Sequence, residues 1–248
     1  MRVVYFLLYF LSVEAAKKLP SYVEQCYRNP PNELSECIKR NINNLRSKVR
    51  DGISELSIPS LNPLILDGTA VLEPNADFRC EVENIKLWNM NNLVINNFEM
   101  ELGKVKKWSL DIGYSYISMD FKYKMKGKLL VLQLDSSGTG FGNVTGVNLK
   151  IDTDLTTYVK NNGKEYLTVK DVNVKMDTDS GHFNFENLFK DKEDLNERAN
   201  RIINENYKVF LEDFKPLVEN IIKSFVKQLF NTFYSKFSYD VLFPEKVQ

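Results

Sequence analysis

Histidine is almost absent from this sequence of 248 residues, which contains only His182. A hydrolytic triad would have to use that one residue, and neither a nucleophile-elbow motif nor paired zinc-ligand spacing accompanies it. Net charge is also absent, because 33 basic residues balance 33 acidic ones. A neutral chain has no overall field that attracts phosphate backbones or anionic headgroups. We therefore expect no catalysis, no metal, no cofactor and no nucleic-acid partner.

Two short motifs resemble ligand-binding loops but fail on their context. Residues 138–142 read Gly-Thr-Gly-Phe-Gly, yet a phosphate loop must lead into a helix, and strand-like alternation resumes at Val147. Residues 177–181 resemble the start of a calcium loop, but Leu188 stands where a bidentate glutamate is required. We therefore predict a turn in a bent sheet at the first motif, reject the second, and expect His182 in a turn.

The amino terminus has the three parts of a secretory signal. Arg2 precedes nine consecutive apolar residues, and small residues follow at Ala15 and Ala16. Nine residues are far fewer than the roughly 20 that a membrane-spanning helix needs, and no later stretch of the sequence approaches that length. We predict a signal peptide over residues 1–16, cleaved after Ala15 or Ala16, and one soluble extracellular domain over residues 17–248.

If the protein is secreted, its cysteines can form disulfides, because the extracellular compartment is oxidising. Cys26 and Cys37 lie eleven residues apart, and we predict a bridge that holds the amino-terminal segment to the helix that follows. Cys80 has no evident partner and is expected to be an inert buried thiol, with a bridge between two chains as the alternative. Asn143 begins the sequon Asn-Val-Thr, so we predict an exposed glycosylation site there.

The spacing of apolar residues divides the mature chain into helix, sheet and helix. Apolar residues recur at helical spacing over residues 34–49 and stop at an Asp-Gly pair. Over residues 59–179 the period changes to two, which indicates strands. Turn-forming residues separate these strands at 67–68, 136–138 and 161–163. Because the connections are short, we predict an antiparallel meander.

The last segment predicts a helix over residues 195–237, about 43 residues and 65 Å long, with Asp194 as its cap. A compact chain of this size is only about 45 Å across, so the body must be elongated or the helix bent. We expect a kink or an interruption at Pro216.

Sixteen residues between 207 and 237 are apolar, and a narrow polar stripe runs from Lys208 to Asn231. More than half of the helix circumference therefore needs burial. A strongly curved antiparallel sheet that wraps the helix would supply this, and an ordinary sandwich with a helix pair is the alternative. We predict an elongated α+β fold of the first kind.

Short segments spread over nearly the whole mature chain carry a resemblance to a known family. They are Leu19-Pro20-Ser21, Glu36-Cys37, Gly52-Ile53-Ser54-Glu55-Leu56, residues 58–64 (Ile-Pro-Ser-Leu-Asn-Pro-Leu), Gly138-Thr139-Gly140, residues 183–189 (Phe-Asn-Phe-Glu-Asn-Leu-Phe) and Leu242-Phe243-Pro244. In this order and spacing the chain resembles the takeout and juvenile-hormone-binding protein family of insects.

The resemblance implies a long carboxy-terminal helix inside a curved sheet, an internal tunnel for a hydrophobic ligand, and a relation to the tubular lipid-binding superfamily. It also implies a place in hormone, feeding, circadian or chemosensory physiology. A single bridge is similar to the takeout branch, because juvenile-hormone carriers of the moth haemolymph type look as though they have a second one.

We therefore predict a secreted carrier that binds a small hydrophobic ligand, such as a juvenile-hormone-like terpenoid or a fatty acid, without converting it. The alternative is an extracellular module that docks on lipid or protein and has a filled interior. We expect a monomer without stable membrane insertion. The predicted tunnel lining is Trp88, Phe98, Trp108, Phe121 and Tyr123 from strands, with Phe210, Phe214 and Phe225 from the helix.

Overall fold

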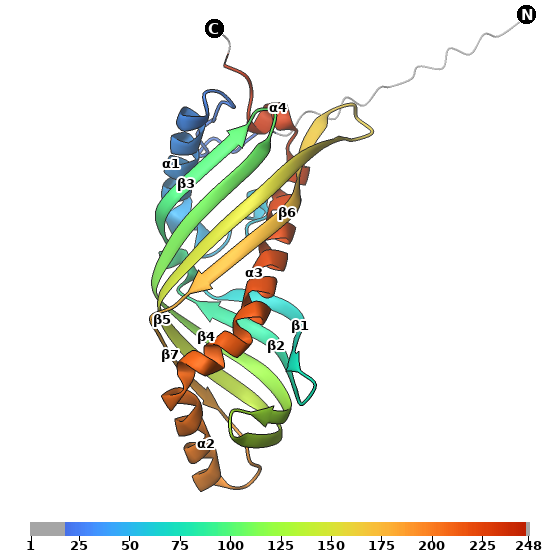
Figure 1. Ribbon diagram of the computed structural model, residues 1–248. Helices are drawn as coiled ribbons and strands as arrows, with labels where there is room; N and C mark the ends of the chain where they lie inside the picture. Colours follow the sequence, from blue (N-terminus) through green and yellow to red (C-terminus); the bar gives the residue numbers. More distant parts are fainter. Residues whose placement is uncertain (1–17, 247–248) are drawn as a thin grey trace, which may run out of the picture.

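The structure, a computed structural model, describes residues 18–246, so the predicted signal peptide lies outside the described residues. Its centre is one antiparallel sheet that curls along a long carboxy-terminal helix, in an elongated body (Figure 1). The strands are β1 (Leu64–Asn75), β2 (Phe78–Trp88), β3 (Val94–Leu102), β4 (Lys106–Leu129), β5 (Leu132–Val159), β6 (Glu165–Asp177) and β7 (Ser180–Phe185). The helices are α1 (Pro31–Val49), α2 (Glu193–Glu205), α3 (Tyr207–Lys236) and α4 (Tyr239–Leu242), with short 3₁₀ turns η1 (Ser54–Leu56) and η2 (Met90–Asn92). The predicted α+β class is confirmed.

The hairpin of β4 and β5 runs the length of the body. It keeps one register from the pair Leu129–Leu132 at one end to the pair Lys106–Leu155 at the other. In one half of the body β2 and β7 flank this hairpin, and β1 lies outside β2. In the other half β3 and β6 flank it. Each half encloses its own cluster of buried apolar side chains.

The sheet changes its buried face at the middle of this hairpin. Buried residues of β4 are even-numbered as far as Tyr114 and odd-numbered from Ile117. Gly146 of β5 lies at the same level and has φ of 60°, and a Cβ there would collide with the side chain of Asp179. Glycine is therefore required at the change of face. The even-numbered and the odd-numbered buried stretches therefore belong to one continuous strand.

Two of the three predicted turns are wrong, because both segments lie inside strands. Gly68 has φ of 112° and sits in a β-bulge of β1, whereas residues 136–138 belong to β5. Further along β5 a Cβ on Gly140 would collide with the ring of Phe121, so glycine here gives an aromatic ring access to the sheet surface. The turn predicted at 161–163 does connect β5 to β6.

The predicted long helix is two helices, and it breaks at Asn206 rather than at Pro216, which lies within α3. Helix α2 packs against β7, whereas α3 packs mainly against β6 and also contacts β7 and β1. The predicted cap is also wrong. Helix α2 begins at Glu193 after Lys192, so Asp194 occupies its first turn.

The polar stripe of α3 follows the edge of β6. Lys215 pairs with Asp177, Glu219 accepts the Met176 N–H, Lys223 pairs with Asp171, Lys227 donates to the Lys170 carbonyl, and Asn231 accepts the Val169 N–H. These helix residues recur every fourth position, so they form one row along the helix. The row occupies an edge that would otherwise expose unpaired backbone groups.

Helix α2 covers the edge of β7 in a similar way, with three asparagines spaced four residues apart. The side-chain amide of Asn200 accepts the Phe185 N–H at 2.8 Å and donates to the Phe185 carbonyl at 3.0 Å. Asn204 binds the two backbone groups of Phe183 at 2.8 and 2.7 Å. Asn196 accepts the N–H of Phe189. The amides of Asn200 and Asn204 thus each take the place of a peptide group in a next strand.

Replacing one of these amides should destabilise the fold. We expect Asn200→Leu to lower the free energy of unfolding by about 2 kcal/mol, because it leaves an N–H and a carbonyl of β7 without partners. Urea denaturation would measure the change, with Asn220→Leu on an exposed position of α3 as the control. Equal stability of the two variants would show that the amide row contributes nothing.

Candidate functional site

An apolar cavity of about 240 Å³ lies in the half of the body that contains α1, and we call it the inner cavity. Its wall combines the segment before α1 with α1 itself, β3, β4, α3 and the end of the chain. Apolar residues of this wall include Leu19, Val23, Ile38, Ile42, Leu45, Phe98, Met100, Leu110, Phe230 and Phe233. The site is therefore assembled from segments that are far apart in the sequence.

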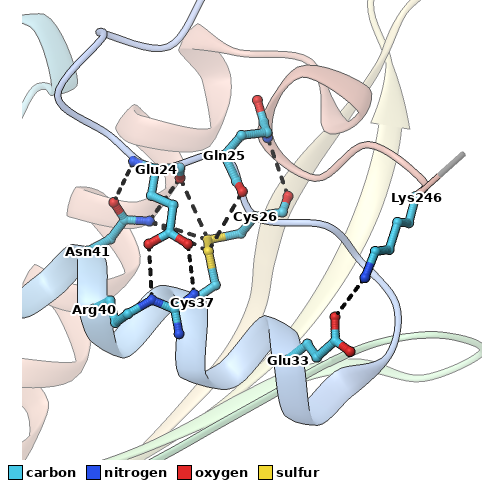
Figure 2. Close-up of polar contacts among 8 residues, drawn as sticks. All are labelled: Glu24, Gln25, Cys26, Glu33, Cys37, Arg40, Asn41 and Lys246. Atoms are coloured by element: carbon cyan, nitrogen blue, oxygen red, sulfur yellow. Dashed lines mark hydrogen bonds and ion pairs between the residues drawn. A yellow bond between two sulfur atoms is a disulfide. The ribbon is translucent and has the colours of Figure 1, made fainter.

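Residues 19–28, which we call the N-terminal segment, are held on α1 by a disulfide and by hydrogen bonds (Figure 2). The predicted bridge between Cys26 and Cys37 is present. Asn41 accepts the Glu24 N–H and donates to the Glu24 carbonyl, both at 2.9 Å. Arg40 binds the Glu24 carboxylate through two N–H groups at 2.7 and 3.1 Å, which lowers the pKa of Glu24. This side of the cavity wall is thus fixed to the helix.

The end of the chain packs on the same segment. Gln25 donates to the Leu242 carbonyl at 3.0 Å, and Arg28 donates to the Phe243 carbonyl at 2.7 Å. The Arg28 guanidinium also lies 4.2 Å from the ring centre of Tyr239, an attractive cation–π arrangement. Leu242 and Phe243 both line the inner cavity. The two ends of the described chain therefore close the cavity together.

A larger and more open groove of about 910 Å³ runs between β1 and α3, and we call it the outer groove. Ile58 and Leu229 line both the outer groove and the inner cavity, so the two spaces meet at these side chains. Strand β1 is an edge strand here. Within residues 65–72, which the structure describes, no backbone group is hydrogen-bonded to α3, whereas two backbone N–H groups of β6 donate to α3 side chains.

The predicted lining residues fall into four places. Phe98 and Trp108 line the inner cavity, and Phe225 lines the outer groove. Phe121, Tyr123, Phe210 and Phe214 lie in the opposite half, where they pack with Phe183 and Phe185. The rings of Phe210 and Phe214 are only 4.4 Å apart between centroids. Side chains thus occupy much of that half.

Trp88 is the predicted residue that the structure places elsewhere, on the surface. It is 38% exposed, and its indole N–H donates to Asp120 at 2.9 Å. The wrong prediction for Trp88 is explained by a bulge in β2. Asn84 has φ of 54° there and lies within a shift of the pairing register with β4. A bulge reverses the alternation of side chains beyond it. Trp88 therefore points away from the interior, and we correct its assignment.

Several residues of the inner cavity escaped the sequence analysis. The wall residues of α1 could have been found from the apolar stripe of that helix, which includes Ile38, Ile42 and Leu45. The contributions of Leu19 and Val23 had no comparable signal, because they follow from the disulfide and from Asn41.

Two potentially reactive groups considered in the sequence, Cys80 and His182, both lie in strands. Cys80 is completely buried, which raises the pKa of its thiol to about 12, with a smaller contribution from Glu81, so almost no thiolate exists at neutral pH. His182 lies in β7 opposite the exposed Asn143, which corrects its predicted place in a turn.

Among residues 18–246, no group of three or more His, Cys, Asp or Glu side chains is arranged to hold a metal ion. Over the same residues, each helix is too short or too polar to cross a membrane.

Comparison with known proteins places this geometry in a family. The model of the haemolymph juvenile hormone binding protein family matches residues 4–244. The circadian clock-controlled protein daywake of Drosophila melanogaster is 22% identical over 243 residues, which cover 94% of this chain and 92% of that protein. Daywake of Drosophila yakuba is 24% identical and covers 93% of this chain and 90% of its own length.

The crystal structure of Takeout 1 from Epiphyas postvittana has the same fold. It superposes with a TM-score of 0.72 at 20% identity, covering 87% of this chain and 97% of the other. The curved sheet around a carboxy-terminal helix is therefore a shared architecture. With the family model matching almost the full length, this chain belongs to the haemolymph juvenile hormone binding protein family.

Proposed function

We propose that this protein is a secreted carrier that binds a small hydrophobic molecule in the inner cavity and releases it unchanged. The observation that carries the proposal is the composition of the cavity wall. Of its twenty residues, only Glu24 and Asn41 have charged or amide side chains, and both side chains bind partners within the protein. Such a wall favours ligands through the burial of apolar surface.

The size of the cavity limits the ligand. Pockets for drug-sized molecules usually measure about 300–1,000 Å³, and the inner cavity is slightly smaller at about 240 Å³. A medium-length hydrocarbon chain or a short terpenoid therefore suits it best. A longer fatty acid or juvenile-hormone-like terpenoid would have to extend past Ile58 and Leu229 into the outer groove, which we propose as the entrance.

A second candidate function is an extracellular module that docks on a lipid surface or on another protein. The aromatic cluster of the opposite half supports it, because Phe183, Phe210 and Phe214 pack closely where a continuous tunnel would run. The open outer groove would then be a docking surface, and the inner cavity would have no ligand.

Titration of delipidated protein with the fluorescent probe N-phenylnaphthylamine separates the two functions. A carrier is expected to bind the probe saturably at one site and to release it when a medium-chain lipid is added. Sedimentation with lipid vesicles, combined with no saturable uptake of the probe, would instead support the docking module. Native mass spectrometry of protein purified from its source would identify the ligand that co-purifies.

A further inference from the structure

Two polar groups of the inner cavity wall have no hydrogen-bond partner beyond each other among the described residues. Trp108 is 3% exposed and lines the cavity, and its indole nitrogen has no hydrogen-bond partner among the described residues. Tyr234 is 2% exposed and lines the same cavity from α3. Its hydroxyl interacts with the Trp108 indole, in a contact whose geometry falls short of a full hydrogen bond. A buried donor without an acceptor costs free energy, so this pair is unusual in a folded protein.

The two groups lie close to each other. Burial raises the pKa of the Tyr234 hydroxyl, and a weak hydrogen bond from the Trp108 indole opposes a part of that rise. Phe230 packs against both residues, with ring centroids 4.9 Å from Trp108 and 5.7 Å from Tyr234. Rings therefore surround the pair, and the hydrogen bonds that it can make face little competition from water.

The remaining polar groups of the wall do not need a ligand. Asn41 uses its amide on the backbone of Glu24, and the Glu24 carboxylate is paired with Arg40. No Lys, Arg or His side chain is part of the wall over the described residues. A ligand carboxylate would therefore enter without a cation in the wall to neutralise it.

We infer that Tyr234 and Trp108 bind an oxygen atom of the ligand, and that the ligand is an uncharged lipophile carrying a hydrogen-bond acceptor, such as an ester, a ketone or an ether. The inference rests on the proposed function and adds the chemical class of the ligand. An acceptor oxygen placed beside the pair would satisfy donors that the protein leaves unsatisfied. A pure hydrocarbon would leave them as they are, and a carboxylate would bring an unpaired charge.

The test compares ligands of similar length by displacement of N-phenylnaphthylamine: methyl caprate, dodecane and capric acid at neutral pH. We expect Tyr234→Phe to weaken the binding of methyl caprate about threefold to tenfold and to leave that of dodecane unchanged. Capric acid should bind the unmodified protein less tightly than its methyl ester does. Urea denaturation should show little loss of stability in Tyr234→Phe, because the hydroxyl loses only its weak contact with the Trp108 indole.

Tyr114→Phe is the matched control, because Tyr114 is equally buried at 5% exposure but belongs to the cluster in the opposite half. It should leave the affinity for methyl caprate unchanged. The inference would be overturned if Tyr234→Phe lost affinity equally for the ester and the hydrocarbon, or lost none for either. A loss of affinity for the ester alone in Tyr114→Phe would overturn it as well. In all of these cases the carrier function stands. Tighter binding of capric acid than of its ester would overturn the uncharged class. Absence of saturable binding by every ligand would instead overturn the proposed function.

Discussion

Leu229→Trp is expected to weaken ligand binding about 50-fold while the protein remains folded. The leucine side chain lies where the inner cavity meets the outer groove. An indole that displaces about three methylene groups of the ligand removes roughly 2.4 kcal/mol of apolar burial, which corresponds to that change in affinity. Titration with N-phenylnaphthylamine measures it.

Gln228→Trp is the matched control, because residue 228 is exposed, lies on the same helix and lines the outer groove alone. It adds the same ring next to the junction and should change the affinity less than twofold. A ligand that binds in the outer groove would reverse this order, with Gln228→Trp as the weaker binder. Similar affinities for both variants and the unmodified protein would show that the cavity does not hold the ligand.

Local patterns in the sequence predicted the elements that depend on local chemistry. The apolar stripe over residues 34–49 appears as α1, and the turn at 161–163 connects β5 to β6. The bridge between Cys26 and Cys37 was predicted because the two cysteines are close in the sequence. In each case the residues that decide the structure are near neighbours along the chain.

The errors share one cause, which is that contacts between distant segments decided the outcome. Pro216 is the strongest local helix breaker, yet the helix continues through it and breaks at Asn206, beyond which it packs mainly against β6. The glycine-rich residues 138–142 have the composition of a turn but lie in β5, where Gly140 leaves room for the ring of Phe121. The polar stripe of α3 binds the edge of β6, a partner that the helical spacing does not reveal. None of these partners could be identified from one sequence.

The candidate site was the hardest part to predict for the same reason. Aromatic residues were chosen from the strands and the last helix, and Phe98 and Trp108 do line the inner cavity. The other side of that cavity comes from the N-terminal segment and α1, which the periodicity of the long helix cannot reveal. A bulge at Asn84 moved Trp88 to the surface. A site formed between distant segments needs coordinates.

Removal of the disulfide is expected to have the largest effect on stability. The double variant Cys26→Ala/Cys37→Ala should lose about 3 kcal/mol in the free energy of unfolding, because the bridge closes a loop of about this length in the unfolded chain. Ligand affinity should fall as well, since Leu19 and Val23 of the cavity wall lie on the segment that the bridge holds. Urea denaturation and probe titration measure the two effects.

Cys80→Ala provides the control, because it shortens a buried cysteine of the opposite half that forms no bridge. It should lower the stability by about 1 kcal/mol through the lost packing alone and leave ligand binding unchanged. A reducing agent added to the unmodified protein or to Cys80→Ala should cause the same loss of stability as the double substitution. It should not change the stability of the double variant. If the double variant were no less stable than Cys80→Ala, the hydrogen bonds of Asn41, Gln25 and Arg28 would be sufficient to hold the N-terminal segment. The bridge would then have no role in closing the cavity.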